Sequence, residues 1–366
     1  MISINKNILR IVLVLSYVAV IAFLIFGISS VYSYLNTGAD RSTMLHTEIK
    51  KIDQYLPNMA WSPFNHEGRP MDSQTLNRIQ NGYLDAWYVK QVAYKTNTTV
   101  GISDYYTDNA RKHIFNTVAL NRTNNISIES TTLKHRPTLE FFSEDGQLAV
   151  ITDNDIVEYK RIFDGKKMVF ETTEKATYKA TLLLEDGFWR IRHITKTAVD
   201  NYEAPHVPAN KQNENINGIN YYPQATPWNM FSADFDLEII SKDFKIIKDA
   251  GLNSIRIFLQ YEDFGKANVK PKKIEKLKQV LNLAHENKLK VIVTLFDFFG
   301  DYTVLNWSLN QRHAETIVSQ LKNHPAIYAW DIKNEPNLDF ESRGKQLVIS
   351  WLDNMIDIVK SIDTIH

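Results

Sequence analysis

The first hydrophobic pattern along the chain is an uncharged, mostly apolar run from Ile11 to Leu35. About 20 apolar residues suffice to cross a bilayer as a helix. Lys6 and Arg10 precede the run and no basic cluster follows it immediately, so the positive-inside rule places the N-terminus in the cytoplasm. We expect residues 1–40 to form a cytoplasmic tip and a transmembrane anchor. A cleaved signal peptide is the alternative.

Residues 41–200 change from helical spacing to extended runs. Apolar residues recur at three and four positions in Arg41–Leu56, in Asp72–Lys95 and around Asp104–Val118. The extended runs, rich in Thr, Val, Ile, Tyr and Phe, are Ile126–Lys134, Thr138–Ser143, Gln147–Phe163, Met168–Leu184 and Phe188–Thr197. Asp-Gly pairs separate the later runs, which is typical of β-hairpins. This order predicts an α+β domain in which an antiparallel sheet wraps around a helix.

A Pro- and Asn-containing stretch without periodicity, residues 201–217, predicts a linker. Strands and helices then alternate to the end of the chain. The predicted strands are Gly218–Tyr222, Asn253–Leu259, Lys290–Phe296 and Ile327–Ile332, and the predicted helices are Phe235–Ala250, the one that Pro271 opens, Ala314–Leu321 and Gly344–Ile362. Strands recur about every 35 residues, as in a (β/α)8 barrel of about 250 residues. We predict the α/β class, with a TIM barrel truncated after four βα units in residues 218–366.

The amino-acid composition indicates which classes of ligand or partner to expect. Lys+Arg 42 balances Asp+Glu 42, so no basic field favours nucleic acid. Aromatic residues reach 11%, and sugar-binding clefts use such rings for stacking, although large cores absorb them too. The chain has no cysteine, which for an extracytoplasmic protein fits a bacterium. No metal-ligand spacing or glycine-rich phosphate loop is present, so we expect neither a metal nor a cofactor.

The fourth predicted strand ends in a polar turn that suits glycoside chemistry. Asn334 and Glu335 follow the strand, and Pro336 stops its pairing because proline has no backbone N–H. A carboxylic acid can hold a proton for the leaving oxygen, while the adjacent amide grips a sugar hydroxyl. The tripeptide alone is weak evidence, and the four regular βα units give it weight.

Four motifs in the last part of the chain resemble clan A glycoside hydrolases, most of all the family 5 cellulases and endo-mannanases. They are GINYYPQATPW at 218–228, AGLNSIRIF at 250–258, LKVIVTLFDFFGDY at 289–302 and HPAIYAWDIKNEP at 324–336. The resemblance implies that Glu335 is the general acid/base and that Asn334 binds the 2-hydroxyl of the sugar. It implies also that Arg256 orients the nucleophile carboxylate.

The resemblance covers only the N-terminal half of a barrel. In the family the nucleophile is a Glu after the seventh strand, and this sequence stops at His366, after the fourth helix. We therefore expect the nucleophile to be missing from this chain, as in a fragment or the product of a truncated reading frame. The association of two half-barrels is the alternative.

Further substrate-binding candidates lie at strand ends or in the loops that follow them. They are Tyr221, Tyr222, Trp228, Asp297, Phe298, Tyr302 and Trp307. Stacking on sugar faces is one interpretation of the rings and loop packing is the other. Asp297 is expected to contact substrate. We expect Trp330 to be a core residue and His285, His313 and His324 to be solvated.

Residues 41–200 resemble the nuclear transport factor 2-like (SnoaL-like) family, through the order of helices and meander and through the closing hairpin LLLEDGFWRIRHI at 182–194. Some members of that family are enzymes, and here Asp85, Tyr106, His113 and His193 are candidates for a polar pocket. The favoured alternative is a spacer or docking module, since the sequence of residues 41–200 shows no paired acid and base.

The sequence thus predicts a membrane-anchored glycoside hydrolase, periplasmic or on the cell surface. It would cleave a β-linked polysaccharide or oligosaccharide by a retaining two-carboxylate mechanism. A non-catalytic glycan-binding or assembly protein is the first alternative. A small-molecule enzyme in residues 41–200 is the second.

Overall fold

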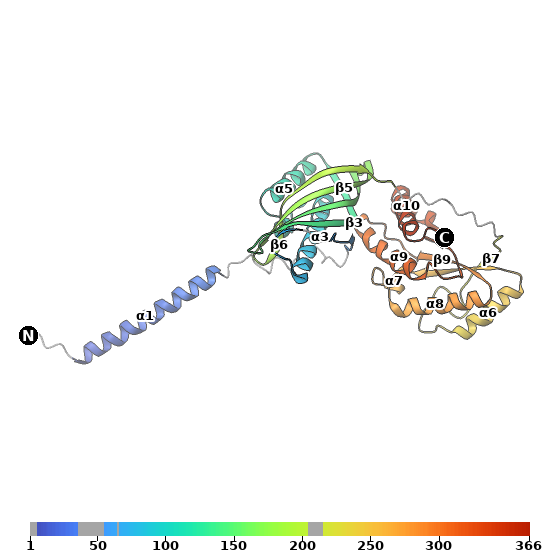
Figure 1. The fold of residues 1–366 in the computed structure, drawn as a ribbon, viewed down its shortest axis with the longest axis horizontal. Coiled ribbons are helices and arrows are strands. Elements are labelled where there is room, and N and C mark those ends of the chain that lie inside the picture. Colours follow the sequence, from blue (N-terminus) through green and yellow to red (C-terminus); the bar gives the residue numbers. More distant parts are fainter. Residues whose placement is uncertain (1–5, 36–54, 64–65, 204–214) are drawn as a thin grey trace, which may run out of the picture.

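The computed structural model describes residues 6–35, 55–63, 66–203 and 215–366. Figure 1 shows a long N-terminal helix, an antiparallel sheet with its helices, and a parallel sheet with its helices. Most of the predicted helix Arg41–Leu56 and most of the predicted linker 201–217 lie outside the described residues.

The helix α1 (Lys6–Leu35) coincides with the apolar run, and its described side chains, residues 13–29, are exposed. Within the described parts of the chain, no helix has both the length and the apolar character that crossing a membrane requires. The membrane anchor therefore stays a prediction from the sequence.

Three helices precede the antiparallel sheet. α3 (Ser73–Thr96) begins where Asp72 accepts a hydrogen bond from the Thr75 backbone N–H at 2.8 Å, as an N-cap does. The predicted helix Asp104–Val118 is divided into α4 (Ile102–Tyr105) and α5 (Asp108–Thr123). The division lies at Tyr106, which is extended and forms a β-bridge with Ile191.

The antiparallel sheet is a meander of four long strands. They are β3 (Ile126–Phe142), β4 (Leu148–Asp164), β5 (Lys167–Glu185) and β6 (Phe188–Asn201), and the two-residue strands β1 (Asn58–Met59) and β2 (Glu67–Gly68) pair with β3. Two predicted strands, 126–134 and 138–143, are joined in β3, whose pairing with β4 shifts register on both sides of Lys134. The sheet curves around α3 and α5 (Figure 1). The buried residues of α3 include Ile79, Tyr83 and Trp87.

The second sheet is parallel, with the order β10-β9-β8-β7. Its strands are β7 (Gly218–Asn220), β8 (Ser254–Gln260), β9 (Lys290–Asp297) and β10 (Ile327–Asp331). The helices are α6 (Leu237–Asp249), the short α7 (Tyr261–Phe264), α8 (Pro271–Glu286), α9 (Trp307–Leu321) and α10 (Lys345–Ile362). The predicted alternation of four strands and four main helices is therefore confirmed. The sheet is open, and the described residues contain no sheet closed into a barrel.

The two sheets are joined through α9 and α10, the helices nearest the antiparallel sheet in Figure 1. The Trp307 ring packs on Tyr159 of β4, with ring centroids 4.2 Å apart. Arg312 donates to the backbone oxygens of Leu56 (3.0 Å) and Pro57 (2.9 Å). Tyr159 lies in the same hydrophobic cluster as the parallel sheet, so one core spans both parts. This packing also explains why α9 begins at Trp307 and not at the predicted Ala314.

Candidate active site

Arg256 is the centre of a polar network that joins three neighbouring parallel strands. From β8, its Nε donates to Thr294 of β9 (3.1 Å) and to Asp331 of β10 (3.2 Å). Its Nη1 donates to the side-chain oxygen of Asn334 at 3.1 Å. Thr294 in turn donates to Asp331 at 2.6 Å. The network fixes the guanidinium group and, through it, the amide of Asn334.

Glu335 follows this network directly. Its side chain is exposed, and its backbone is left-handed with φ 45° and ψ 54°. A non-glycine residue in that conformation stores strain, which persists where the surrounding structure holds it. The Asn334 amide lies 3.4 Å from Oε2 of Glu335. The predicted pair is therefore brought together, with the carboxyl group open to solvent.

Asp297 is a second carboxyl group at this edge of the sheet, and it is 3% exposed. Burial raises the pKa of Asp297, although a backbone N–H and the charges of Lys333 and Arg256 oppose the shift. Its Oδ2 has no hydrogen-bond partner in the described structure. A buried carboxyl oxygen without a partner is costly, and the contact of Asp297 with substrate stays a prediction.

Three of the predicted aromatic residues form an open platform beside Arg256. The Tyr222 and Trp228 rings lie 4.5 Å apart between centroids, and Trp228 and Phe298 lie 5.6 Å apart. Trp228 is 45% exposed and Phe298 is 66% exposed, and both have positive φ. Exposed rings held in strained backbone are suited to stacking against a ligand face.

The structure corrects three other aromatic predictions. Tyr221 is buried and its hydroxyl donates to Asp243 of α6 at 2.9 Å. Tyr302 is buried and bonds to Asp339, and Trp307 is 0% exposed against the first sheet. These rings pack inside the protein, so a sugar face has no access to them.

Residues 208–365 match the family model described as cellulase, glycosyl hydrolase family 5. They form a glycosyl hydrolase family 5 domain. The match begins ten residues before the predicted start at Gly218 (218 − 208 = 10), inside the predicted linker. The predicted resemblance is confirmed for this part of the chain, while that of residues 41–200 to the nuclear transport factor 2-like family stays a prediction.

Several mannan hydrolases are similar to part of this chain. Mannan endo-1,4-beta-mannosidase A of Podospora anserina is 24% identical over 118 residues, which are 27% of this chain and 31% of that enzyme. Mannan endo-1,4-beta-mannosidase 8 of Oryza sativa subsp. japonica is 32% identical over 78 residues, 19% of this chain and 20% of that protein. The chain spans less than half the length of the curated relatives it matches.

A similar solved structure is an exo-beta-1,4-mannosidase from Opitutaceae bacterium strain TAV5. It has a TM-score of 0.36 and 18% sequence identity, and the alignment covers 40% of this chain and 29% of that one.

Sequence reasoning missed three polar residues of the family 5 domain. Asp331 and Thr294 hold Arg256, and Lys333 pairs with Asp339 at 3.1 Å. A carboxylate inside an otherwise apolar strand was the available signal for Asp331, since a buried-strand guanidinium needs a partner. Among the described residues, no group of three potential metal ligands is present.

One histidine prediction is also corrected. His313 was expected to be solvated but is 0% exposed on α9. Its Nδ1 lies 2.8 Å from the Lys266 backbone oxygen and its Nε2 lies 3.1 Å from that of Leu295. His324 bonds to Asn282 at the surface, and Trp330 is half-buried and donates to Asp363 at 2.7 Å.

The candidate pocket residues of the antiparallel domain differ in burial. Tyr106 is buried and donates to the Ala86 backbone oxygen at 2.7 Å, while His113 and His193 are exposed. A different polar pair lies inside the sheet, where His135 Nδ1 is 2.6 Å from Asp153 Oδ2 and both side chains are 0% exposed. The pair is hydrogen-bonded on both sides, as a structural group in a core is.

Proposed function

We propose that the family 5 domain hydrolyses a β-1,4-linked mannan or a related β-glycan by a retaining mechanism. The observation that carries the proposal is the Arg256 network, which places the Asn334 amide beside Glu335 at the carboxyl edge of the parallel sheet. The similarity to mannan endo-1,4-beta-mannosidases supports this substrate class.

In the proposed reaction, Glu335 protonates the leaving oxygen and Asn334 binds the 2-hydroxyl of the sugar. A retaining hydrolase needs a second carboxyl group about 5–5.5 Å from the first, to attack the anomeric carbon. No carboxylate of residues 218–366 matches the nucleophile's motif in sequence, so the proposal takes the nucleophile from outside these residues. Burial raises the pKa of Asp297, and in the proposed reaction its carboxyl group contacts substrate.

The substitution Glu335→Gln, made in a protein that also contains the nucleophile, tests this assignment. The amide keeps the shape of the side chain but has no proton to give, so kcat on β-1,4-mannan should fall by about 10²–10⁴-fold. The control is Glu286→Gln at the end of α8, which should keep wild-type kcat. Release of reducing ends at the wild-type rate by Glu335→Gln would remove Glu335 from the mechanism.

A non-catalytic glycan-binding or assembly protein remains the alternative. The exposed platform of Tyr222, Trp228 and Phe298 favours it as much as it favours the enzyme, because stacking alone binds a sugar. A protein that also contains the nucleophile, binds mannan and releases no reducing ends would decide for this alternative.

We also propose that residues 1–40 anchor the chain in a membrane, with the N-terminus in the cytoplasm and the two domains outside. The uncharged sequence from Ile11 to Leu35 and its helical conformation support this location.

A further inference from the structure

Glu335 has a backbone conformation that its local sequence disfavours. Its φ of 45° and ψ of 54° are left-handed, a region that residues with a Cβ atom rarely adopt. The next residue is Pro336, and the proline ring pushes the residue before it toward extended conformations. Both preferences oppose the observed turn. Contacts with other residues must therefore hold Glu335 in this conformation.

Lys333 forms an ion pair across this turn. It lies two residues before Glu335, and its Nζ is 3.1 Å from Oδ2 of Asp339, four residues after Glu335. The same ammonium group donates to the Asn334 backbone oxygen at 3.3 Å. The Lys333 side chain is only 8% exposed, so its charge needs these partners to offset the loss of hydration. We call the pair of Lys333 and Asp339 the turn clamp, because it joins the two ends of the segment that contains Glu335.

The turn clamp is fixed to the core through Tyr302. The Tyr302 hydroxyl donates to Oδ2 of Asp339, and its ring is 2% exposed. That ring packs on Phe299, with centroids 5.5 Å apart, and on Trp351 of α10, at 5.2 Å. Burial raises the pKa of Asp339, but the hydrogen bonds from Tyr302 and Lys333 lower it overall. Asp339 is therefore ionised near pH 7 and can hold the ammonium group.

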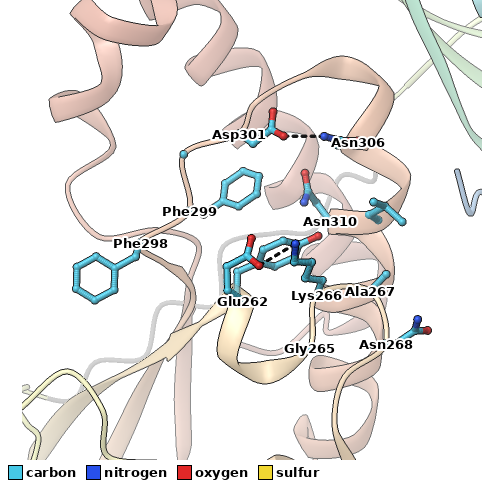
Figure 2. A pocket seen from close by; sticks show the side chains of 13 residues that line it. Glu262, Gly265, Lys266, Ala267, Asn268, Phe298, Phe299, Asp301, Asn306 and Asn310 are labelled. Atoms are coloured by element: carbon cyan, nitrogen blue, oxygen red, sulfur yellow. Dashed lines mark hydrogen bonds and ion pairs between the residues drawn. The ribbon is translucent and has the colours of Figure 1, made fainter. Parts of the chain in front are cut away.

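The loop that carries Tyr302 is held by hydrogen bonds of its own. Asp301 accepts from the Thr303 backbone N–H at 3.0 Å and from the Asn306 amide at 2.7 Å, and Figure 2 marks the second of these bonds. Figure 2 also shows Phe299 of this loop pointing toward the interior of a pocket. The turn clamp therefore connects the Glu335 turn to a loop whose conformation is fixed.

The charge of Lys333 also acts on the second carboxyl group of the candidate site. Burial raises the pKa of Asp297, and the charges of Lys333 and Arg256 oppose this shift while that of Asp331 adds to it. Lys333 therefore influences Asp297 through its charge and the Glu335 turn through its ion pair.

We propose that Lys333 is a positioning residue of the glycoside hydrolase, which holds Glu335 in the left-handed turn through the turn clamp. The inference rests on the proposed function for the role of Glu335 as general acid. A general acid must lie within hydrogen-bonding reach of the leaving oxygen, and a misplacement of about 1 Å can cost about 10²-fold in rate. Lys333 itself touches neither the substrate nor the reacting atoms.

A thermodynamic cycle in the full 366-residue chain tests the turn clamp without reference to catalysis. Glycine adopts the left-handed region without strain, so Glu335→Gly should raise the midpoint of urea unfolding by about 0.2–0.4 M. Lys333→Met removes the ammonium group and lets the turn relax, so Glu335→Gly should give no gain in that background. The control is Lys266→Met, which breaks an exposed ion pair with Glu262, and there the gain should persist.

Kinetics test the catalytic consequence, in a protein that also contains the nucleophile. Lys333→Met should lower kcat on β-1,4-mannan by about 10–100-fold and change KM less than about twofold, because the aromatic platform still binds the sugar. Lys333→Arg keeps a positive charge beside Asp339 and should recover most of the loss. A loss of stability alone would lower the amount of folded enzyme and leave kcat per folded molecule unchanged.

The double variant Lys333→Met with Asp339→Asn replaces Lys333→Met if the single variant fails to fold. It removes both charges of the turn clamp and so leaves no unpaired ion in the domain. Its kcat should show the loss expected of Lys333→Met, and Glu335→Gly should give no gain in this background either.

Two results would overturn the proposal: an equal change of the urea midpoint by Glu335→Gly with and without Lys333, or a wild-type kcat in Lys333→Met. A wild-type kcat in Glu335→Gln would contradict the proposed function instead, and with it the catalytic role of Lys333. The urea cycle does not depend on catalysis, so the turn clamp and the proposed function fail separately.

Discussion

His313 connects the turn after α7 to β9 from within the core. A neutral imidazole has one N–H and can donate to only one of the two backbone oxygens beside it. Burial lowers the pKa of His313 to about 4, against the effect of the two carbonyl groups. The ring is therefore neutral near pH 7, and protonation would place an unsolvated charge inside the domain.

This shift predicts how stability depends on pH. The unfolded chain takes up a proton at His313 near pH 6.5 and the folded chain only near pH 4, so the free energy of unfolding should decrease as pH falls between these values. The full loss is about 3 kcal/mol. Urea unfolding at several pH values should show a smaller slope for His313→Gln than for wild type. Parallel curves would refute the prediction, and exposed His113→Gln is the control.

Which individual side chains reach the candidate site was only partly predictable. Arg256 comes together with Asn334 and Glu335 because β8, β9 and β10 are parallel neighbours, an arrangement that the spacing of the strands already implies. Burial of Tyr221, Tyr302 and Trp307 was beyond the local sequence, because it depends on contacts with α6, with the Asp339 loop and with β4. A ring after a strand has the same sequence pattern whether it faces a cleft or a neighbouring domain.

At the scale of elements, α9 contacts both domains. Asn310 accepts from the Trp351 indole of α10 within the second domain, and Trp307 and Arg312 contact the first domain. The helical periodicity of an isolated segment predicts one buried stripe. α9 is buried on more than one side, and its first turn is mostly polar. The periodicity therefore did not predict that the helix begins at Trp307.

Trp307→Ala should lower the free energy of unfolding by about 3–5 kcal/mol. The ring is 0% exposed, packs on Tyr159, and donates its indole N–H to the Tyr302 backbone oxygen at 3.1 Å. The matched substitution Trp228→Ala removes an equally large but exposed ring and should cost less than about 1 kcal/mol. Urea unfolding compares the two. Equal losses would show that the contact between the domains contributes little.

At the scale of the whole molecule, the proposed anchor determines where the two domains work. Val18→Lys together with Phe23→Lys would place two charges in the apolar run, each costing about 2.5–3.5 kcal/mol at the centre of a bilayer. We expect the wild-type chain in the carbonate-resistant membrane fraction and the double variant outside it. Leu120→Lys, on the exposed surface of α5, is the control. A wild-type chain in the soluble fraction would refute the anchor.

The order of elements was largely predictable, because local spacing and Asp-Gly turns specify helices, hairpins and βα units. Details that depend on contacts between segments far apart in the sequence were not predictable. The division of a predicted helix at Tyr106 reflects pairing with Ile191, and the union of two strands in β3 reflects its bulged ladder with β4. The contact of the two sheets through α9 and α10 left no pattern in the sequence.

The outer edges of β7 and β10 have no neighbouring strand in the described part of the chain. Edges of this kind are templates for other strands. In a living cell, a newly made chain with two such edges is recognised by chaperones and proteases until something covers them. The abundance of this protein should therefore depend on how soon after synthesis those edges are occupied.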